Sequence, residues 1–256
     1  MEVLVITPTY NERDNLPDLV RAVLAHDGYR VLVVDDDSPD GTGAVADALA
    51  RDFPGRVEVL HRQGPRGLGR SYLEGIRLAI TGTADVICQM DADWSHDPKY
   101  LPALVAETAA YDVVIGSRYL NGVSVVNWPL RRIMLSAFAN RYIRGVTRLR
   151  TRDCTSGFRC WRREMLATLP LGNVVSEGYA FIVEMLFEAA AQGARIGEVP
   201  IIFVERRSGA SKLSKGVLLE SMLTPWRLVL RRAIGRRLHG AARQARHAES
   251  RTQSRV

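Results

Sequence analysis

The stretch "RVLVVDDDSPDGTGAVADALARDF", residues 30–53, joins a short apolar strand, an acidic turn and a helix. Its apolar run is continuous, which is typical of a strand covered on both faces. After the turn, apolar residues recur at the three- and four-residue spacing of a helix. A strand of this kind that leads at once into a helix is the repeating unit of a parallel sheet.

The same unit recurs through the first half of the chain. The intervening helices have about a dozen residues, the length that a crossover between parallel strands requires. With 256 residues, 46% hydrophobic and 25% charged, the chain is long enough for one sizeable soluble domain. We predict an α/β fold with a doubly wound, mostly parallel sheet flanked by helices. The other strands are expected at 3–7, 57–62, 85–93 and 112–118, and the helices at 15–26, 69–80 and 99–109.

Acidic and turn-forming residues follow four of these strands, at the sheet edge where such folds bind ligands. Asp91 and Asp93 alternate along an extended segment, so their side chains point the same way. Paired carboxylates are costly to bury without a partner, and Mg²⁺ or Mn²⁺ is commonly held by one or two of them together with substrate phosphates. The alternative is that both cap the following helix, as Asp97 before Pro98 is expected to do. The residues that this edge should gather are Glu12, Asp35, Asp36, Asp91, Asp93 and Arg118.

The second half of the chain departs from the simple alternation. It contains an amphipathic segment at 128–143, a helical pattern at 178–192, a strand at 196–207 and an apolar segment at 217–234 that contains Pro225. Beyond Gly235 the composition is rich in Arg, Ala and Ser, which is typical of disorder. We therefore divide the chain into a catalytic domain (1–205), a loop with an amphipathic helix (206–235) and an Arg-rich tail (236–256).

The net charge of +7 is concentrated at the C-terminal end. Residues 227–256 contain nine of the 35 Lys and Arg side chains and a single one of the 28 acidic side chains. The remaining 226 residues carry 26 basic and 27 acidic side chains and are nearly neutral. This distribution argues against a nucleic-acid-binding body and predicts a local anionic partner for the tail.

Compartment signals are sparse. No apolar run reaches the roughly 20 residues that span a bilayer, and the first residues lack the basic region of a signal peptide. The three cysteines, Cys88, Cys154 and Cys160, have neither zinc-site spacing nor an even number, so neither a disulfide framework nor a zinc site is indicated. A reducing cytoplasm fits this pattern.

Basic residues are also expected at the acidic edge of the sheet. Arg118 ends a strand, Arg132 and Ser136 share one face of a helix, and Arg206 and Lys212 follow the last strand. Such a set indicates phosphate binding, and the alternative is ordinary solvated charge. The glycine-rich stretch "GPRGLGRSYLEG" (64–75) fits either a phosphate-binding turn or a structural one.

The ordered motifs resemble the inverting glycosyltransferases of family 2, which have the GT-A fold, and within them the polyprenol- or dolichol-phosphate mannose synthase group. The resemblance extends from residue 3 to about residue 230. The matching segments are "TPTYNE" (7–12), "VVDDDSPDGT" (33–42), "MDADWSHDP" (90–98), "GSRY" (116–119), "NWPLRR" (127–132) with Ser136, "TSGFR" (155–159) and "IGEVPIIFVERRSGASKL" (196–213).

The resemblance implies a role for each matching residue. Asp91, Asp93 and Arg118 would be catalytic, and Asp93 would bind the Mg²⁺ or Mn²⁺ ion. Ser95 stands where some relatives have Gln as a second metal ligand, and Glu177 stands where some have Lys, so the metal-binding role of Ser95 stays open and no cationic role passes to Glu177. The acceptor phosphate would be bound by Arg118, Arg132 and Ser136. The donor would be bound by Pro8, Tyr10, Glu12, Val34, Asp36, Asp91, Ala92, Asp93, Arg206 and Lys212.

The implied reaction moves mannose from GDP-mannose to a polyprenyl phosphate and gives a β-linked product. The acceptor phosphate is largely dianionic at neutral pH and is itself a nucleophile, so no general base is needed. Two alternatives remain: a glucosyl synthase that uses UDP-glucose, and a non-catalytic subunit that binds nucleotide sugars. The chain is expected to lie peripherally on the cytoplasmic face of the membrane, held by anionic lipid or by an integral membrane anchor protein. The alternative is that the helix predicted within 217–234 packs on the body of the protein and the tail only increases solubility.

Overall fold

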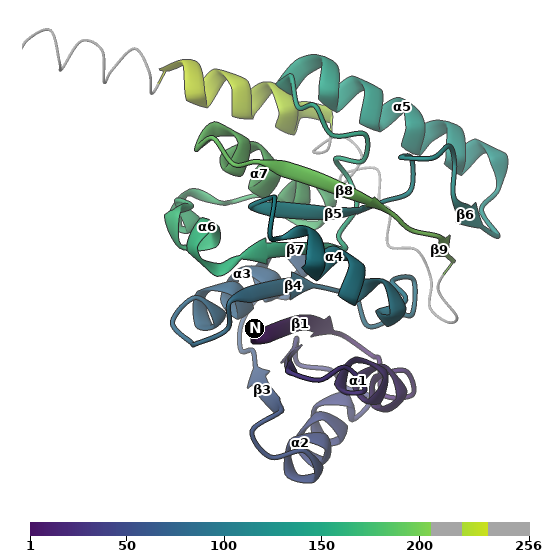
Figure 1. The fold of residues 1–256 in the computed structure, drawn as a ribbon, viewed down its shortest axis with the longest axis vertical. Helices are drawn as coiled ribbons and strands as arrows, with labels where there is room; N and C mark the ends of the chain where they lie inside the picture. Colours follow the sequence, from purple (N-terminus) through teal and green to yellow (C-terminus); the bar gives the residue numbers. More distant parts are fainter. Residues whose placement is uncertain (206–221, 235–256) are drawn as a thin grey trace, which may run out of the picture.

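The computed structural model describes residues 1–205 and 222–234 and contains a seven-stranded sheet (Figure 1). The strand order is β3-β2-β1-β4-β7-β5-β8. Every neighbouring pair is parallel except those made by β7, which runs antiparallel to β4 and β5. The strands are β1 (Val3–Thr9), β2 (Tyr29–Asp35), β3 (Val57–His61), β4 (Val86–Gln89), β5 (Val113–Ser117), β7 (Arg159–Arg162) and β8 (Ile196–Pro200).

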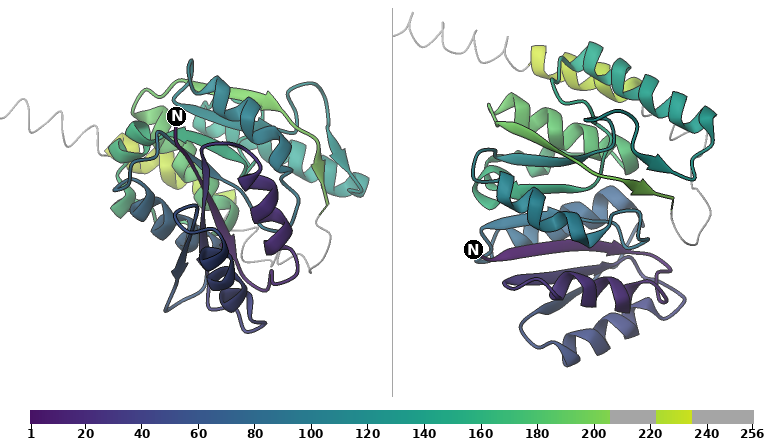
Figure 2. Two further views of the ribbon diagram at one scale, coloured as in Figure 1. Left: turned by 60° about the horizontal axis from the view of Figure 1, so that its bottom comes forward. Right: turned by 45° about the vertical axis from the view of Figure 1, so that its right-hand side comes forward.

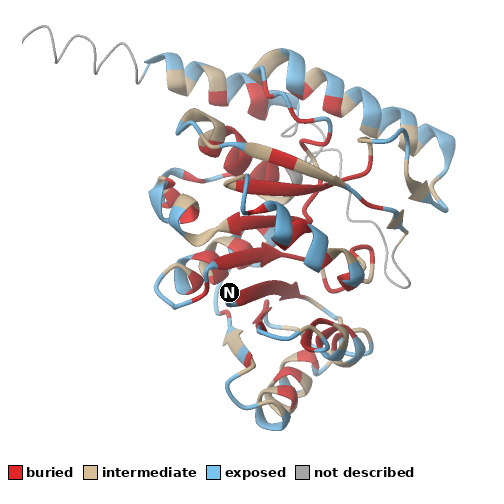
Figure 3. Cartoon of the chain, in the orientation of Figure 1, coloured by how far each residue is buried: buried red, intermediate tan, exposed pale blue. Residues whose placement is uncertain are grey.

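Helices cover both faces of the sheet, as the continuous apolar strands predict. All residues of β1, β4 and β5 are buried, and the sheet appears as the buried layer in Figure 3. One apolar cluster joins the sheet to α1 (Leu16–Leu24), α2 (Thr42–Asp52) and α4 (Leu101–Glu107). A second cluster joins the opposite face to α3 (Leu68–Ala79), α6 (Arg163–Thr168) and α7 (Gly178–Ala191). The predicted doubly wound α/β sheet is therefore confirmed.

Two helices lie side by side beyond the β8 edge (Figures 1 and 2). They are α5 (Leu130–Thr147) and the helix at 222–234. The Tyr142 hydroxyl donates to the Met222 carbonyl at 2.7 Å and links the two. Arg231 forms an ion pair at 2.9 Å with Glu184 of α7, a fully buried carboxylate that also accepts the Ser176 N–H. The helix at 222–234 is thus fixed to the body by a buried charge.

Short elements complete the fold. The single-turn 3₁₀ helices are η1 (Pro98–Tyr100) and η2 (Leu171–Asn173), and β6 (Val125–Val126) pairs in parallel with β9 (Phe203–Val204). Asp97 caps η1 as expected, because its carboxylate accepts the Lys99 N–H at 3.0 Å. The strand expected at 196–207 is divided into β8 and β9, so its second half pairs outside the main sheet.

Strand β7 and its disulfide correct the sequence analysis. The segment around Arg159–Arg162 gave no strand signal, yet it lies between β4 and β5 in the sheet. In this register Cys88 faces Cys160 with a Cα–Cα distance of 4.1 Å, and the structure joins them as a disulfide. The sequence analysis indicated no disulfide framework and missed this single pair, because the partners are 72 residues apart and meet only through β7. Cys154 is unpaired, and burial raises the pKa of its thiol to about 11.

Candidate active site

A pocket of about 510 Å³ lies where β1, β2, β4 and β5 end. Parallel strands bring their carboxyl ends to one edge, which is why acidic segments far apart in the sequence meet here. The pocket gathers the residues expected at this edge except Asp35, whose carboxylate instead accepts the Thr9 and Ser38 hydroxyls at 3.0 and 2.6 Å. The expected site residues that line the pocket are Pro8, Tyr10, Glu12, Asp36, Asp91, Ala92, Asp93, Ser95, Arg118 and Arg132.

Some expected residues lie elsewhere. Val34 is fully buried, with its side chain toward Gly75 of α3, so it is not among the residues that line the pocket. Ser136 also lies outside the lining and shares a hydrogen bond of 2.7 Å with the Tyr119 hydroxyl. Arg206 and Lys212 fall outside the described residues, as do the loop at 206–221 and the tail at 236–256.

The two carboxylates after β4 are held in place by neighbouring groups. The Tyr72 hydroxyl donates to the Asp91 carboxylate at 2.7 Å, and burial, followed by the charge of Asp91, raises the Tyr72 pKa well above its ordinary value. The Asp93 carboxylate accepts the Ser95 N–H at 3.1 Å. Asp91 therefore faces a neutral phenol that remains a donor at any physiological pH.

His96 supports Asp91 from the other side. Its Nδ1 accepts the Asp91 backbone N–H at 3.0 Å, which requires that this nitrogen carry no proton. Burial lowers the His96 pKa, so the neutral ring is favoured. The ring also stacks on Phe158 at 5.0 Å. His96 thus positions the backbone of Asp91, the first residue of the acidic pair.

The acidic pair fits a metal ion that the substrate helps to bind. Within the described part of the chain, no group of three or more His, Cys, Asp or Glu side chains is arranged to hold a metal. Asp91 and Asp93 line the same pocket, and buried Ser95 lies beside them. Mg²⁺ is commonly bound by one or two carboxylates, with substrate phosphates and water in the other positions. The donor set is therefore suited to an ion carried by a diphosphate.

Arg118 is buried against a partner that the sequence did not reveal. Its guanidinium donates two hydrogen bonds of 2.7 Å to Asp153 and one of 2.7 Å to Thr155. Burial alone would raise the Asp153 pKa, but the neighbouring Arg118 charge outweighs it and lowers that pKa. Asp153 therefore orients the Arg118 guanidinium. Arg118 itself lies at the pocket edge, as the sequence predicted.

Arg132 lies on the first turn of α5, near Arg118, since both guanidinium groups approach the Trp128 ring. Its guanidinium stacks over the Trp128 ring at 4.1 Å and forms an ion pair of 2.5 Å with Glu205. Both Arg132 and Trp128 line the pocket. The stacking on Trp128 and the ion pair with Glu205 therefore fix the plane of the Arg132 guanidinium at the pocket surface. The contact with Glu205 leads directly to residues 206–221, which the structure does not describe.

The glycine-rich turn before α3 also lines the pocket. The Gly67 N–H donates to Asp36 at 2.8 Å, and Asp36 also forms an ion pair with the buried Arg62. A Cβ atom on Gly67 would lie 2.5 Å from the Glu177 carboxylate, which itself pairs with Arg70 at 2.6 Å. The Gly67 amide is thus occupied by Asp36, which favours the structural turn over the phosphate-binding one.

Arg159 lies behind the lining of the pocket and holds two of its segments together. It is nearly inaccessible to solvent and donates to the carbonyls of Ser156, Ile182 and Cys154 at 2.8, 2.6 and 2.8 Å. Burial lowers its pKa to about 10. Ser156 and Ile182 line the pocket, so this one side chain ties two segments of the lining together. Arg159 is the last residue of the motif "TSGFR", but the motif alone did not indicate that this side chain holds the pocket together.

Comparisons with known proteins agree with this geometry. The family model described as "Glycosyl transferase family 2" matches residues 4–169. The polyprenol monophosphomannose synthase of Mycolicibacterium smegmatis is 47% identical over 221 residues, which are 86% of this chain and 83% of that protein. The undecaprenyl-phosphate mannosyltransferase of Micrococcus luteus is 45% identical over 234 residues, covering 90% of this chain and 96% of that protein.

Solved structures share the fold. Glucosyl-3-phosphoglycerate synthase from Mycobacterium tuberculosis, in complex with Mn²⁺, UDP and glucosyl-3-phosphoglycerate, has a TM-score of 0.60 at 18% identity and covers 90% of this chain and 79% of its own. The same synthase with Mg²⁺ and UDP has a TM-score of 0.62 at 17% identity, covering 88% and 79%. The GT-A fold predicted from the sequence is confirmed. The family model covers well over half of the chain, and we conclude that the chain belongs to glycosyl transferase family 2.

Proposed function

We propose that the pocket transfers mannose from GDP-mannose to a polyprenyl phosphate at the cytoplasmic face of a membrane. The observation that carries this proposal is the meeting of two carboxylates, Asp91 and Asp93, with two cations, Arg118 and Arg132, in one pocket. Such a pocket suits a diphosphate donor with its metal ion and a phosphate acceptor. The names of two relatives at 45–47% identity, one a monophosphomannose synthase and one a mannosyltransferase, support mannose as the sugar and a polyprenyl phosphate as the acceptor.

The donor is assigned to the side of Asp91 and Asp93. A divalent ion bound there would neutralise the charge that develops on the leaving diphosphate. Tyr72 and His96 hold Asp91, and the Ser95 amide holds Asp93, so the carboxylates are oriented before the donor arrives. Fixed groups aimed at developing charge need little rearrangement during the reaction. Mg²⁺ or Mn²⁺ is the proposed ion.

The acceptor is assigned to the side of Arg118 and Arg132. A phosphate monoester is largely dianionic at neutral pH and can attack without a general base. The described histidine of this pocket, His96, uses its Nδ1 to accept a backbone hydrogen bond, which is consistent with that expectation. Displacement on the face opposite the leaving diphosphate inverts the sugar carbon and gives the β-linked product. The residues thus position and neutralise the reactants.

Apolar side chains on α5 and the helix at 222–234 offer a surface for the lipid. No helix among the described residues is long and apolar enough to cross a bilayer. The helix at 222–234 does pack on the body through Leu228, but it also leaves apolar side chains in solvent. We propose that the two helices lie in the headgroup region, which places the Arg132 end of α5 near the membrane. The exposed apolar residues, here called the apolar face, are Leu130, Met134, Leu135, Phe138, Met222, Leu223, Trp226, Leu230 and Ile234.

The test separates the three functions that the pocket could serve. Purified protein is incubated with labelled GDP-mannose or UDP-glucose, Mg²⁺ and a short polyprenyl phosphate, and the label in the lipid is measured. We expect label from GDP-mannose. Label from UDP-glucose alone would identify a glucosyl synthase. Binding of either nucleotide sugar without any transfer would indicate a non-catalytic subunit and contradict the proposal.

A further inference from the structure

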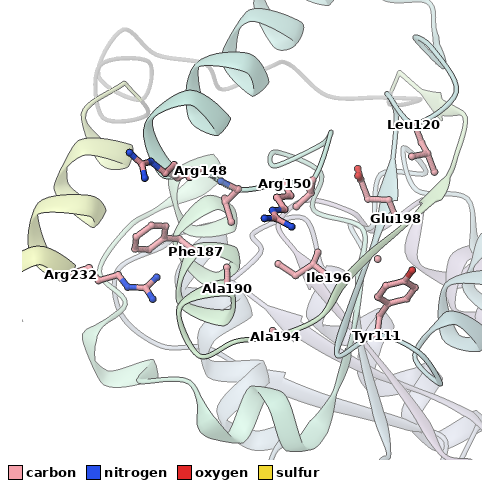
Figure 4. Close-up of a pocket in the computed structure, with 14 residues that line it drawn as sticks. Tyr111, Leu120, Arg148, Arg150, Phe187, Ala190, Ala194, Ile196, Glu198 and Arg232 are labelled. Atoms are coloured by element: carbon pink, nitrogen blue, oxygen red, sulfur yellow. Dashed lines mark hydrogen bonds between the residues drawn. The ribbon is translucent and has the colours of Figure 1, made fainter. Parts of the chain in front are cut away.

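A second pocket, of about 570 Å³, lies at the amino-terminal end of β8 (Figure 4). Its walls come from the end of α5, from α7 and from Arg232 of the helix at 222–234. Among the described residues it shares no lining residue with the candidate active site. It is therefore a separate cavity from the one assigned to the two reactants.

The charge of this second pocket is net positive, since three Arg side chains and one Glu side chain line it. Arg148, Arg150 and Arg232 contribute to its lining, and Figure 4 shows Arg148 and Arg232 on either side of Phe187. Within residues 1–205 and 222–234, the exposed side chains of Arg148 and Arg150 make no ion pair or hydrogen bond. The lining carboxylate of Glu198 is already occupied by the backbone N–H groups of Arg152 and Asp153, at 2.8 and 3.0 Å. The unsatisfied charge therefore favours an anion.

The lining also has an apolar component. Leu149, Phe187, Ala190 and Ile196 lie beside the guanidinium groups. Arg232 lies over the Phe187 ring at 5.7 Å and donates to the Ala191 carbonyl at 3.2 Å, so its charge is held at the apolar wall. A pocket that combines cations with apolar surface suits an amphiphile better than a free inorganic anion, which would leave the apolar part in contact with water.

The second pocket and the apolar face involve the same two helices. Arg148 directly follows α5, and Arg232 belongs to the helix at 222–234. These are the two helices that carry the exposed apolar side chains. A lipid whose acyl chains lie against that face would bring its phosphate to the level of the arginines, since headgroup phosphates lie just outside the hydrocarbon region.

We propose that the second pocket binds the headgroup phosphodiester of an anionic glycerophospholipid, which anchors the protein beside its acceptor. This inference rests on the membrane placement in the proposed function and adds a specific site to it. Arg148 and Arg150 bind the phosphodiester, Arg232 closes the wall from the second helix, and the apolar residues contact the glycerol and the first carbons of the chains.

The experiment uses the full chain and a soluble lipid, so that no membrane is needed. Dihexanoyl-phosphatidylglycerol below its micelle concentration is titrated into wild type, Arg148→Gln/Arg150→Gln and Arg141→Gln/Arg144→Gln, with inorganic phosphate as a second probe. Arg141 and Arg144 are exposed on α5 and line neither pocket, so they control for the same loss of charge. We expect saturable lipid binding that weakens roughly 10- to 30-fold in the pocket variant and stays near wild type in the control.

Several outcomes would overturn the proposal. Equal weakening in both variants would mean diffuse charge attraction, and inorganic phosphate that binds as tightly as the lipid would mean a free-anion site. No saturable lipid binding would also contradict it. Transfer to a short polyprenyl phosphate is measured in parallel and should be unchanged in the pocket variant. A lack of transfer in every protein would reject the proposed function while the titration still reported on the second pocket.

Discussion

Arg118 is buried at the wall of the active site and its charge is balanced by Asp153, which is completely buried. Replacing Asp153 with Asn would leave the guanidinium without a carboxylate, and breaking a buried pair in this way costs about 3–5 kcal/mol. We expect that loss in the free energy of unfolding by urea at pH 7. Asp112→Asn, which breaks the surface pair with Arg195, is the control and should cost much less.

The sign of the pH dependence follows from the lowered native pKa of Asp153. The ion pair of Asp153 contributes its full stabilisation to the folded state above the ordinary pKa of 3.8. This stabilisation is lost as the pH falls through the lower native pKa. The stability gap between wild type and Asp153→Asn should therefore be equal at pH 7 and pH 5 and shrink below about pH 4. A gap that already narrows between pH 7 and pH 5 would show that Asp153 is not held in this ion pair.

Arg132 offers a separate test of the acceptor side. A charge-assisted phosphate contact contributes roughly 1.5–3 kcal/mol, so Arg132→Ala should raise the KM for the polyprenyl phosphate about 10- to 150-fold. The Kd for GDP-mannose should change little, and Arg131→Ala, an exposed neighbour outside the pocket lining, should leave both values near wild type. If Arg132→Ala weakens the donor and not the acceptor, the two sides of the pocket have been assigned the wrong way round.

At the scale of elements, α5 and the helix at 222–234 expose the apolar surface proposed to meet the membrane. Phe138 is 64% exposed, and burying a side chain of this size contributes about 1.5–3 kcal/mol. Phe138→Glu should therefore weaken co-sedimentation with anionic vesicles roughly tenfold or more. Leu78→Glu, an exposed apolar position on α3, is the control. Equal vesicle binding by the two variants would exclude α5 from the membrane contact.

Four of the strands that the sequence predicted share one property, and β7 lacks it. β1, β2, β4 and β5 contain continuous apolar residues that only a doubly covered sheet can bury, so their pattern identifies them. β7 has the sequence Arg-Cys-Trp-Arg, and it is buried because Arg159 is satisfied by three backbone carbonyls. That compensation comes from segments distant in the chain and leaves no local pattern.

The same reasoning explains which site residues could be predicted. Residues at strand ends were brought together as expected, because parallel strands fix where their ends lie. The Val34 side chain points toward α3 and is not among the lining residues, because alternate residues of a strand face opposite sides of the sheet. Asp153 and Arg62 were missed, since each is identified by a partner that only the folded chain supplies.

For the whole molecule, the charge distribution separates a nearly neutral body from a basic C-terminal segment. Residues 236–256 carry six Arg and one Glu, and each Arg near an anionic surface contributes on the order of 1 kcal/mol, reduced by salt. Deleting them should weaken binding to anionic vesicles at low salt. Transfer to a short, detergent-solubilised acceptor should remain. Equal vesicle binding by the full-length and shortened proteins would show that the tail does not contact lipid.

Transfer of labelled mannose by wild type and by Asp93→Asn is the most direct test that this pocket carries out the reaction. The substitution keeps the shape of the side chain but removes the charge that would bind the metal ion of the donor, so activity in saturating Mg²⁺ should fall about 100-fold or more. Asp97→Asn, which alters the cap of η1 outside the pocket lining, is the control and should retain activity. Losing even one group that stabilises charge in the transition state usually lowers turnover by more than about tenfold. If folded Asp93→Asn protein keeps its turnover within about tenfold of wild type, the assignment is contradicted.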